Sequence, residues 1–370
     1  MAESMANLYV STNYGLPKSL LAVLLVLHVL FTAFQVRTSA LHTRLSMSSG
    51  ILNIMATFAA LFLSFMEDQR SVEPSDVLVI YFSALSILSL PRLRSLWLIP
   101  SVEVCRGLWT AAYIFTVAVL FVESARKTKL LRGLYQRVTS EQICGFWGRS
   151  FFIWVLPFFQ VGYSKILHVH DMPEVDDDLL GQNAGAKLLS AWEEAKSTQG
   201  NHRLLRATFR AYLWSYLSGV IPRLALSAFT FCQPFLITAT VDFLGSPATA
   251  ESDKYGQALV GAYVLVYLGL AVSTAVYWRQ TYRFNTVIRS GLVTIVYQHS
   301  TVLKANDLKD TAAITLMGTD VERIVSEFKT IHETWASLLE VGVAIWLLER
   351  QISVICIVPA IISLGNLPFL

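Results

Sequence analysis

Residues 279–332 read RQTYRFNTVIRSGLVTIVYQHSTVLKANDLKDTAAITLMGTDVERIVSEFKTIH, a polar interval between two apolar runs. The run before it, Leu259–Trp278, is long enough to cross roughly 30 Å of hydrocarbon. Apolar residues then recur at the spacing of an amphipathic helix: Phe284, Val287, Ile288, Leu292, Ile295, Val296, Val302 and Leu303. A helix from Leu259 to Leu303 would be roughly 68 Å long, so about half of it must stand in water.

A second amphipathic helix returns toward the membrane. Thr319 and Glu322 have the spacing of a capping box, which predicts a helix start at this point. One face then carries Val321, Ile324, Val325, Phe328, Ile331 and Trp335. This helix continues into the apolar run Ala336–Leu348, so the two helices form an antiparallel pair joined near Ala305–Leu316. Such a pair is a lever between a membrane and a cytoplasmic partner.

The composition indicates a polytopic membrane protein. Hydrophobic residues make up 54% of the 370 residues and charged residues 15%, with a mean hydropathy of +0.52. The net charge of +3 is spread out, which argues against a nucleic-acid surface. The four cysteines have no C-x-x-C spacing, and His168, His170, Asp171 and Glu174 lack a further ligand motif, so we expect no metal site.

Four apolar runs open the chain: Ser19–Phe34, Gly50–Phe65, Val77–Leu90 and Gly107–Val122. The basic residues of 126–137 follow and favour a cytoplasmic location for that segment. Four spans then place the N-terminus inside. The charge rule alone prefers three spans, with Val77–Leu90 only dipping into the membrane.

A linker and further membrane helices follow. Gly145–Tyr163 is rich in aromatics, contains Pro157 and predicts a helix lying in the membrane interface. Ala184–Thr198 predicts a short amphipathic helix with Trp192 on its apolar face. An arginine at the membrane centre costs roughly 2.5 to 3.5 kcal/mol on insertion scales. We therefore predict that the next span is Leu224–Leu244, which leaves Arg223 near the cytoplasmic edge. A last apolar run begins at Ile352.

Several motifs together resemble the multidrug-resistance-associated, or C, subfamily of ABC exporters, especially its filamentous-fungal members. They are RSFFIWVLPFFQVGYSKILHVHDMPEVDDDL (Arg149–Leu179), FCQPFLITATVDFL (Phe231–Leu244), LMGTDVERI (Leu316–Ile324) and HETW (His332–Trp335). The resemblance covers nearly the whole chain.

This resemblance implies an all-α, multi-pass protein of the plasma or vacuolar membrane, built in three parts. Residues 1–123 would form an extra N-terminal membrane domain, 124–207 a cytosolic lasso linker with an interfacial elbow helix, and 208–370 an incomplete first transmembrane domain of four helices. The bend between the long helices would be a coupling helix, with Asp310, Thr311 and Ala312 near its tip, which docks on a nucleotide-binding domain. Against the family pattern, the extra domain shows four spans instead of five and the chain stops inside the fourth helix. We therefore expect a truncated exporter.

The chain offers no catalytic residues and no cofactor site of its own. A phosphate-binding Walker A loop needs glycine followed by lysine, and no glycine of this chain precedes a lysine. ATP and magnesium are therefore expected only with nucleotide-binding domains supplied by a longer product or a partner. Candidate substrate-cavity residues, on helices that line the cavity in the family, are Gln233, Thr238, Trp278, Tyr282 and Trp346. For Trp278 and Tyr282, anchoring at the membrane interface is the competing interpretation.

These observations favour part of an exporter for amphipathic small molecules, such as drugs, conjugates or secondary metabolites. The expected partners are the lipid bilayer, the substrate and nucleotide-binding domains. Two alternatives stay open, a membrane adaptor that regulates another transporter and a remnant without function. A secondary transporter would need inverted repeats or buried ionisable groups near the membrane midplane, and neither is evident in the sequence.

Overall fold

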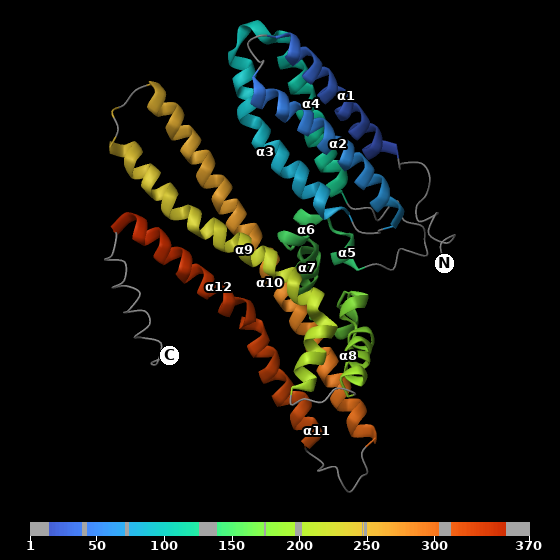
Figure 1. Ribbon diagram of the computed structural model, residues 1–370. Coiled ribbons are helices and arrows are strands. Elements are labelled where there is room, and N and C mark those ends of the chain that lie inside the picture. Colours follow the sequence, from blue (N-terminus) through green and yellow to red (C-terminus); the bar gives the residue numbers. More distant parts are fainter. Residues whose placement is uncertain are drawn as a thin grey trace. The chain divides into compact units, whose positions relative to one another are not determined.

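The computed structural model describes residues 15–38, 43–70, 74–125, 139–173, 175–196, 202–245, 247, 250–302 and 312–352. All regular structure in these ranges is helical, which confirms the predicted all-α class (Figure 1). The chain divides into two compact units, Met1–Asp176 and Asp177–Leu370. The division falls inside the predicted linker, and the predicted three-part domain organisation stays a prediction.

Seven helices in the described part of the chain are long and apolar enough to cross a membrane. Four of them belong to the first unit: α1 (Gly15–Arg37), α2 (Arg44–Arg70), α3 (Asp76–Leu98) and α4 (Glu103–Ser124). Each contains one of the four predicted apolar runs. Because α3 is as long as α1, at 23 residues, its length favours four spans over three.

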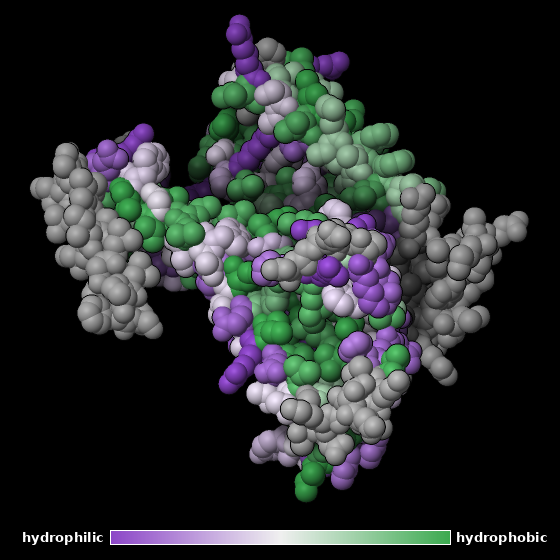
Figure 2. All heavy atoms as spheres, turned by 60° about the horizontal axis from the view of Figure 1, so that its bottom comes forward, coloured by the Kyte–Doolittle hydropathy of each residue, from purple (hydrophilic) through white to green (hydrophobic). Residues whose placement is uncertain are grey.

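The first unit has its core along α1 and α4. Helix α1 packs against both α2 and α4, and α3 packs against α4. Leu21, Leu24, Phe82 and Val119 are fully buried between them. Other large apolar side chains of the unit face outward, among them Phe58 at 62% exposure, and Figure 2 shows hydrophobic side chains spread over much of the visible surface. A bundle that exposes this much apolar surface suits a lipid environment.

The aromatic segment is not the single helix that we predicted. It forms α6 (Phe146–Ser150), the 3₁₀ turn η6 (Ile153–Val155) and α7 (Leu156–Ser164). The helix is interrupted at Phe152, which has a φ of 53°, whereas Pro157 lies in the first turn of α7, where proline is tolerated. Arg149 pairs with Asp76, and the Trp147 indole donates a hydrogen bond to Ser83 (2.8 Å), so this segment is tied to α3.

Short elements complete the described chain: η3 (Pro100–Val102), α5 (Ser140–Ile143), η7 (Val169–Asp171) and η8 (Asp177–Leu179).

The first α-helix of the second unit is α8 (Gly181–Lys196), which confirms the predicted amphipathic helix, with Trp192 packed on the core. It lies against the long helices α9 (Arg203–Gly245) and α10 (Ala250–Val302). At 1.5 Å per residue the 53 residues of α10 extend about 80 Å, which confirms a helix well over twice as long as the hydrocarbon is thick.

The returning helix starts earlier than predicted. It consists of α11 (Ala312–Thr315), a π-helical turn η9 (Leu316–Asp320) and α12 (Val321–Ile352). Thr319 therefore lies inside the helix and does not cap it. Glu322 does not reach back either, because its carboxylate pairs with Arg289 of α10 (2.7 Å). The predicted last span lies outside the described residues beyond Ile352.

The predicted apolar faces form much of the core of this unit. Phe284, Ile288 and Leu292 of α10 are buried with Val321 and Val325 of α12. Two positions were assigned to the wrong side: Val302 is 83% exposed, and Ile324 is 40% exposed. Val302 is the last residue of α10, and Ile324 lies at the edge of the buried face of α12, about 100° around the axis from Val325.

Candidate functional site

A buried ionic cluster joins α9 to α12. The Arg223 side chain on α9 is only 6% exposed. Its Nη1 donates to Glu340 Oε1 (2.7 Å) and its Nη2 donates to Glu333 Oε2 (2.9 Å). Ser227, one turn further along α9, accepts from Arg223 Nη1 (2.8 Å) and donates to Glu340 (2.6 Å). A buried cation needs such partners, because an unpaired charge is strongly disfavoured in an apolar interior.

Helix geometry explains why one guanidinium reaches both carboxylates. Glu333 and Glu340 are seven residues apart, so they project from the same face of α12 two turns apart. The planar guanidinium of Arg223 lies between them and donates from separate nitrogens. The sequence placed Arg223 at the membrane edge to avoid the cost of a buried charge. That position stays a prediction; the structure adds that α12 supplies two counter-ions for the buried charge.

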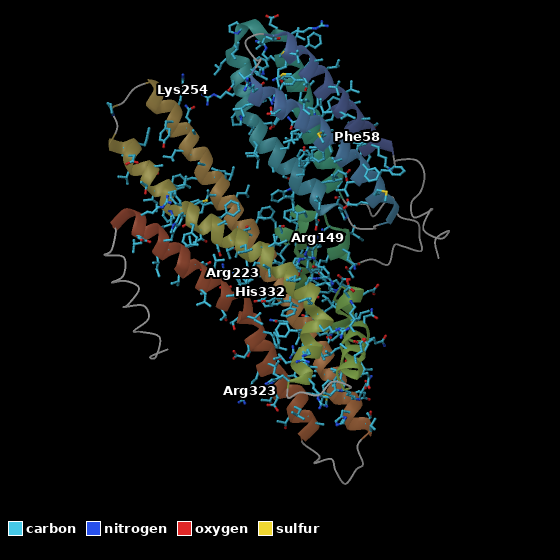
Figure 3. The ribbon with its side chains drawn as sticks, in the orientation of Figure 1. Phe58, Arg149, Arg223, Lys254, Arg323 and His332 are labelled. Atoms are coloured by element: carbon cyan, nitrogen blue, oxygen red, sulfur yellow. The ribbon has the colours of Figure 1, made fainter. Side chains whose placement is uncertain are left out.

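A group of aromatic rings, Tyr216, Tyr277 and His332, lies beside this ionic cluster. His332 is 1% exposed, and its ring stacks on Tyr216 of α9 at 4.5 Å between centroids. The Tyr277 ring of α10 meets it edge-on at 6.1 Å. Gly219 makes this approach possible, since a Cβ there would lie 2.9 Å from His332 Nε2. Figure 3 shows Arg223 and His332 close together, with Arg323 further along α12. The aromatic rings and the ionic cluster thus connect α9, α10 and α12 at one level.

The five predicted cavity residues are only partly brought together. The rings of Trp278 and Tyr282 lie 5.8 Å apart on α10, and Lys329 Nζ of α12 lies within 5.6 Å and 5.3 Å of their centroids. This is a cation–π arrangement that the sequence did not predict.

The other three predicted residues lie at other levels of the helices. Gln233 and Thr238 are at least ten residues beyond Arg223, about 15 Å along α9, and the Thr238 hydroxyl donates to its own helix at Pro234 O (3.1 Å). Trp346, at the far end of α12, is 51% exposed and stacks with Arg350 instead.

The predicted coupling residues lie at the edge of what the structure describes. Asp310 and Thr311 are outside the described residues, and Ala312 is the first residue of α11.

In the acidic turn, Asp171 accepts hydrogen bonds from Lys165 Nζ (2.6 Å) and from the His168 backbone (3.1 Å). The Lys165 hydrogen bond lowers the pKa of the Asp171 carboxyl, which favours its charged form. The hydrogen bonds of this carboxylate stabilise the local turn.

Comparison with known proteins identifies the relatives of this chain. ABC multidrug transporter B of Aspergillus fumigatus is 33% identical over 345 residues, which is 92% of this chain and 23% of that protein. ABC transporter atnG of Emericella nidulans is 33% identical over 94% of this chain and 22% of its own length. The chain is homologous to part of the fungal ABC transporters.

A further relative is an ABC-type transporter of Gibberella zeae, with 35% identity over 81% of this chain and 20% of its own length. This chain therefore spans about a fifth of the length of these ABC transporter relatives. No family model matches it. The homology and the seven apolar helices of the described residues together agree with a multi-pass membrane protein.

Proposed function

We propose that the chain is the N-terminal membrane portion of a C-subfamily ABC exporter that moves amphipathic small molecules out of the cytoplasm. The observation that carries the proposal is the homology of 81–94% of the chain to fungal ABC transporters. The chain then provides membrane helices and the lever, and nucleotide-binding domains of the same or another polypeptide provide ATP hydrolysis. The membrane is the plasma membrane or the vacuolar membrane.

The lengths of α10 and of the α11–α12 helix support the lever. Only about 20 residues are needed to cross the hydrocarbon, so more than half of the 53 residues of α10 extend beyond it. The ion pair Arg289–Glu322 and the apolar core between α10 and α12 hold the two helices together in this extension. In the proposed mechanism, the segment that contains Asp310, Thr311 and Ala312 docks on a nucleotide-binding domain, and its movement is transmitted to the Arg223 level.

Transport is tested with membrane vesicles from cells that express the tagged chain together with its native partners. We expect ATP-dependent uptake of a fluorescent amphipathic dye into inside-out vesicles, no uptake with ADP, and an ATP-binding polypeptide purifying with the tag. Vesicles that show neither uptake nor such a polypeptide would overturn the proposal. A purified complex that regulates another transporter, without dye uptake of its own, would establish the adaptor function instead.

The substrate contacts are tested by a pair of aromatic variants on one helix. Tyr282→Ala removes a 54% exposed ring beside Trp278, and Tyr297→Ala removes a 60% exposed ring fifteen residues further along α10. If Tyr282 contacts the dye, Y282A raises the dye concentration needed for half-maximal uptake several-fold, as expected for the loss of about 1 kcal/mol of aromatic contact, and Y297A does not. Equal effects of both variants would remove Tyr282 from the substrate site.

A further inference from the structure

The Arg92 side chain connects two helices of the first unit that do not otherwise pack closely. Among the described residues, α1 packs on α2 and on α4, and α3 packs on α4, whereas α2 and α3 are not a closely packed pair. Arg92 of α3 crosses this α2–α3 edge of the bundle. Its Nη1 donates to the Ser49 hydroxyl of α2 (3.3 Å), and its Nη2 donates to Gln35 Oε1 of α1 (3.3 Å).

The Arg92 guanidinium is held against two aromatic rings and has no carboxylate partner among the described residues. Its Cζ lies 5.1 Å from the centroid of the Phe31 ring and 4.4 Å from that of Trp109. Both of its hydrogen-bond acceptors are neutral, and they use two of the five N–H donors of a guanidinium. A cation in a membrane helix is costly without a counter-charge, so the remaining donors suit an anionic ligand.

Trp109 offers a further donor beside this cation. The residue is 5% exposed, and its indole Nε1 is buried without a hydrogen-bond partner in the part of the chain that the structure describes. A buried N–H that stays unpaired is disfavoured. A phosphate oxygen bound to the guanidinium would lie beside the Trp109 ring and supply the missing acceptor. A guanidinium also matches the geometry of a phosphate group.

The bundle end that holds Arg92 is strongly basic. It is the end at which α1 and α3 finish and α2 and α4 begin, at the top of the first unit in Figure 1. Its arginines are Arg37, Arg44, Arg92, Arg94 and Arg106, and Glu103 is the only acidic residue of 35–38, 43–49 and 91–106. With four spans this end lies opposite the predicted cytoplasmic linker, so the positive-inside rule does not account for its arginines. Lipid phosphates on that side would be partners for them.

An exposed apolar path leads from Arg92 along the α2–α3 edge toward the middle of the bundle. Leu88 lies one turn before Arg92 on α3 and is 70% exposed, and Leu52 lies one turn after Ser49 on α2 and is 68% exposed. The spacing places each leucine on the same helix face as its polar neighbour. Because α3 ends and α2 begins near Arg92, both leucines lie on the membrane side of the arginine. An acyl chain between them would have its head group at Arg92.

We propose that the α2–α3 edge binds an acidic phospholipid, with the phosphate at Arg92 and Trp109 and an acyl chain between Leu52 and Leu88. The lipid would neutralise the Arg92 cation and fill the edge at which α2 and α3 lack close packing. The proposal concerns binding by the first unit and does not depend on transport.

The test counts lipids bound to the full purified chain in detergent micelles by native mass spectrometry. The chain is titrated with dioleoyl phosphatidylserine or with dioleoyl phosphatidylcholine. We expect the first phosphatidylserine to bind with a dissociation constant about fivefold lower than the first phosphatidylcholine, as expected for one basic contact to an acidic lipid. Equal dissociation constants for the two lipids would overturn the proposal.

A soluble competitor distinguishes the whole lipid from its head group. Glycerophosphoserine has the head group of phosphatidylserine without the acyl chains. We expect that it does not displace the bound lipid when both are present at equal concentration. Displacement would show that the head group alone is the ligand and would overturn the assignment to a phospholipid.

Two arginine variants at the same end of the bundle test the phosphate position. Arg92→Gln should abolish the preference for phosphatidylserine. Arg106→Gln is the matched control and should keep it, because the Arg106 guanidinium also lies on a tryptophan ring, that of Trp97 (4.8 Å), without bridging α2 and α3. A wild-type preference in R92Q, or an equal loss in R106Q, would contradict the assignment of the phosphate to Arg92.

A tryptophan variant separates lipid binding from the bridge to Ser49, which Arg92→Gln also removes. Trp109→Phe deletes the indole N–H and keeps an aromatic ring beside the guanidinium. It should raise the dissociation constant of phosphatidylserine about threefold, as expected for the loss of one hydrogen bond, with unchanged helical circular dichroism. An unchanged dissociation constant in W109F would contradict the site at Trp109.

Discussion

Arg223→Gln, combined with Glu340→Gln in a double-mutant cycle, measures how strongly the buried cluster holds α9 to α12. Arg223 is 6% exposed and donates to Glu340, Glu333 and Ser227 at 2.7, 2.9 and 2.8 Å. Hydrogen bonds to charged groups contribute about 1.5 to 3 kcal/mol each in water-soluble proteins. Measured couplings between membrane helices are smaller, about 0.6 kcal/mol on average and 1.7 at most.

The exposure of the carboxylates decides between these magnitudes. The Glu340 side chain is 31% exposed and that of Glu333 39%, so the protein encloses neither carboxylate fully, and both pairs should be weaker than a fully buried pair. Glu340 has the shorter contact and also accepts from Ser227, so we expect a coupling of about 1 to 2 kcal/mol between Arg223 and Glu340. The coupling between Arg223 and Glu333 should be smaller.

The assay is reversible unfolding of the full chain in mixed micelles, with increasing mole fractions of a denaturing detergent. Glu327→Gln is the matched control on α12, because Glu327 is exposed and lies 13 residues before Glu340, about 20 Å along the helix. A coupling between Arg223 and Glu340 no larger than that between Arg223 and Glu327 would refute the view that the buried contact holds the two helices.

Three further predictions concern close contacts of the second unit. Gly291→Ala places a Cβ against the Tyr212 hydroxyl and should raise hydrogen exchange throughout α8, with a destabilisation of about 1 to 3 kcal/mol; unchanged exchange would show that α8 is held elsewhere. Gly219→Ala should displace the His332 ring and lower the unfolding midpoint, and adding His332→Ala should restore part of the loss; no recovery would exclude the steric cause. Arg289→Gln breaks an exposed ion pair and should change stability by less than about 1 kcal/mol, so a larger loss in the same unfolding assay would contradict a solvent-screened pair.

The long helices were predictable because their signal is local. Leu259–Trp278 is an uninterrupted apolar run, and Phe284, Ile288 and Leu292 continue it at helical spacing, so a window of neighbouring residues contains the whole pattern. The same reason explains the success with α1 to α4 and with α8, whose Trp192 lies on the apolar side of a short periodic segment.

The ionic cluster was not predicted because its partners are 110 and 117 residues apart in sequence. A usable signal was present nevertheless. Arg223 and Glu340 are isolated charges of opposite sign in two apolar segments, and a pair is the least costly way to bury both. The backbone irregularities were harder to predict: Phe152 adopts its positive φ without being a glycine, and Gly318 in the π-helical turn Leu316–Asp320 does not by itself indicate a π turn.

The π-helical turn η9 holds one residue more than a regular turn of the same helix would. A π turn contains one residue more than an α turn, and one residue corresponds to about 100° around the helix axis. Deleting Gly318, whose added Cβ would meet nothing within 4 Å, would convert the turn to regular α-helix and leave Val321 and Val325 in their core positions. The wider π turn already takes up that rotation, so the deletion would also leave α11 facing as it does now, and the turn accommodates one extra residue while the helices on both sides keep their register.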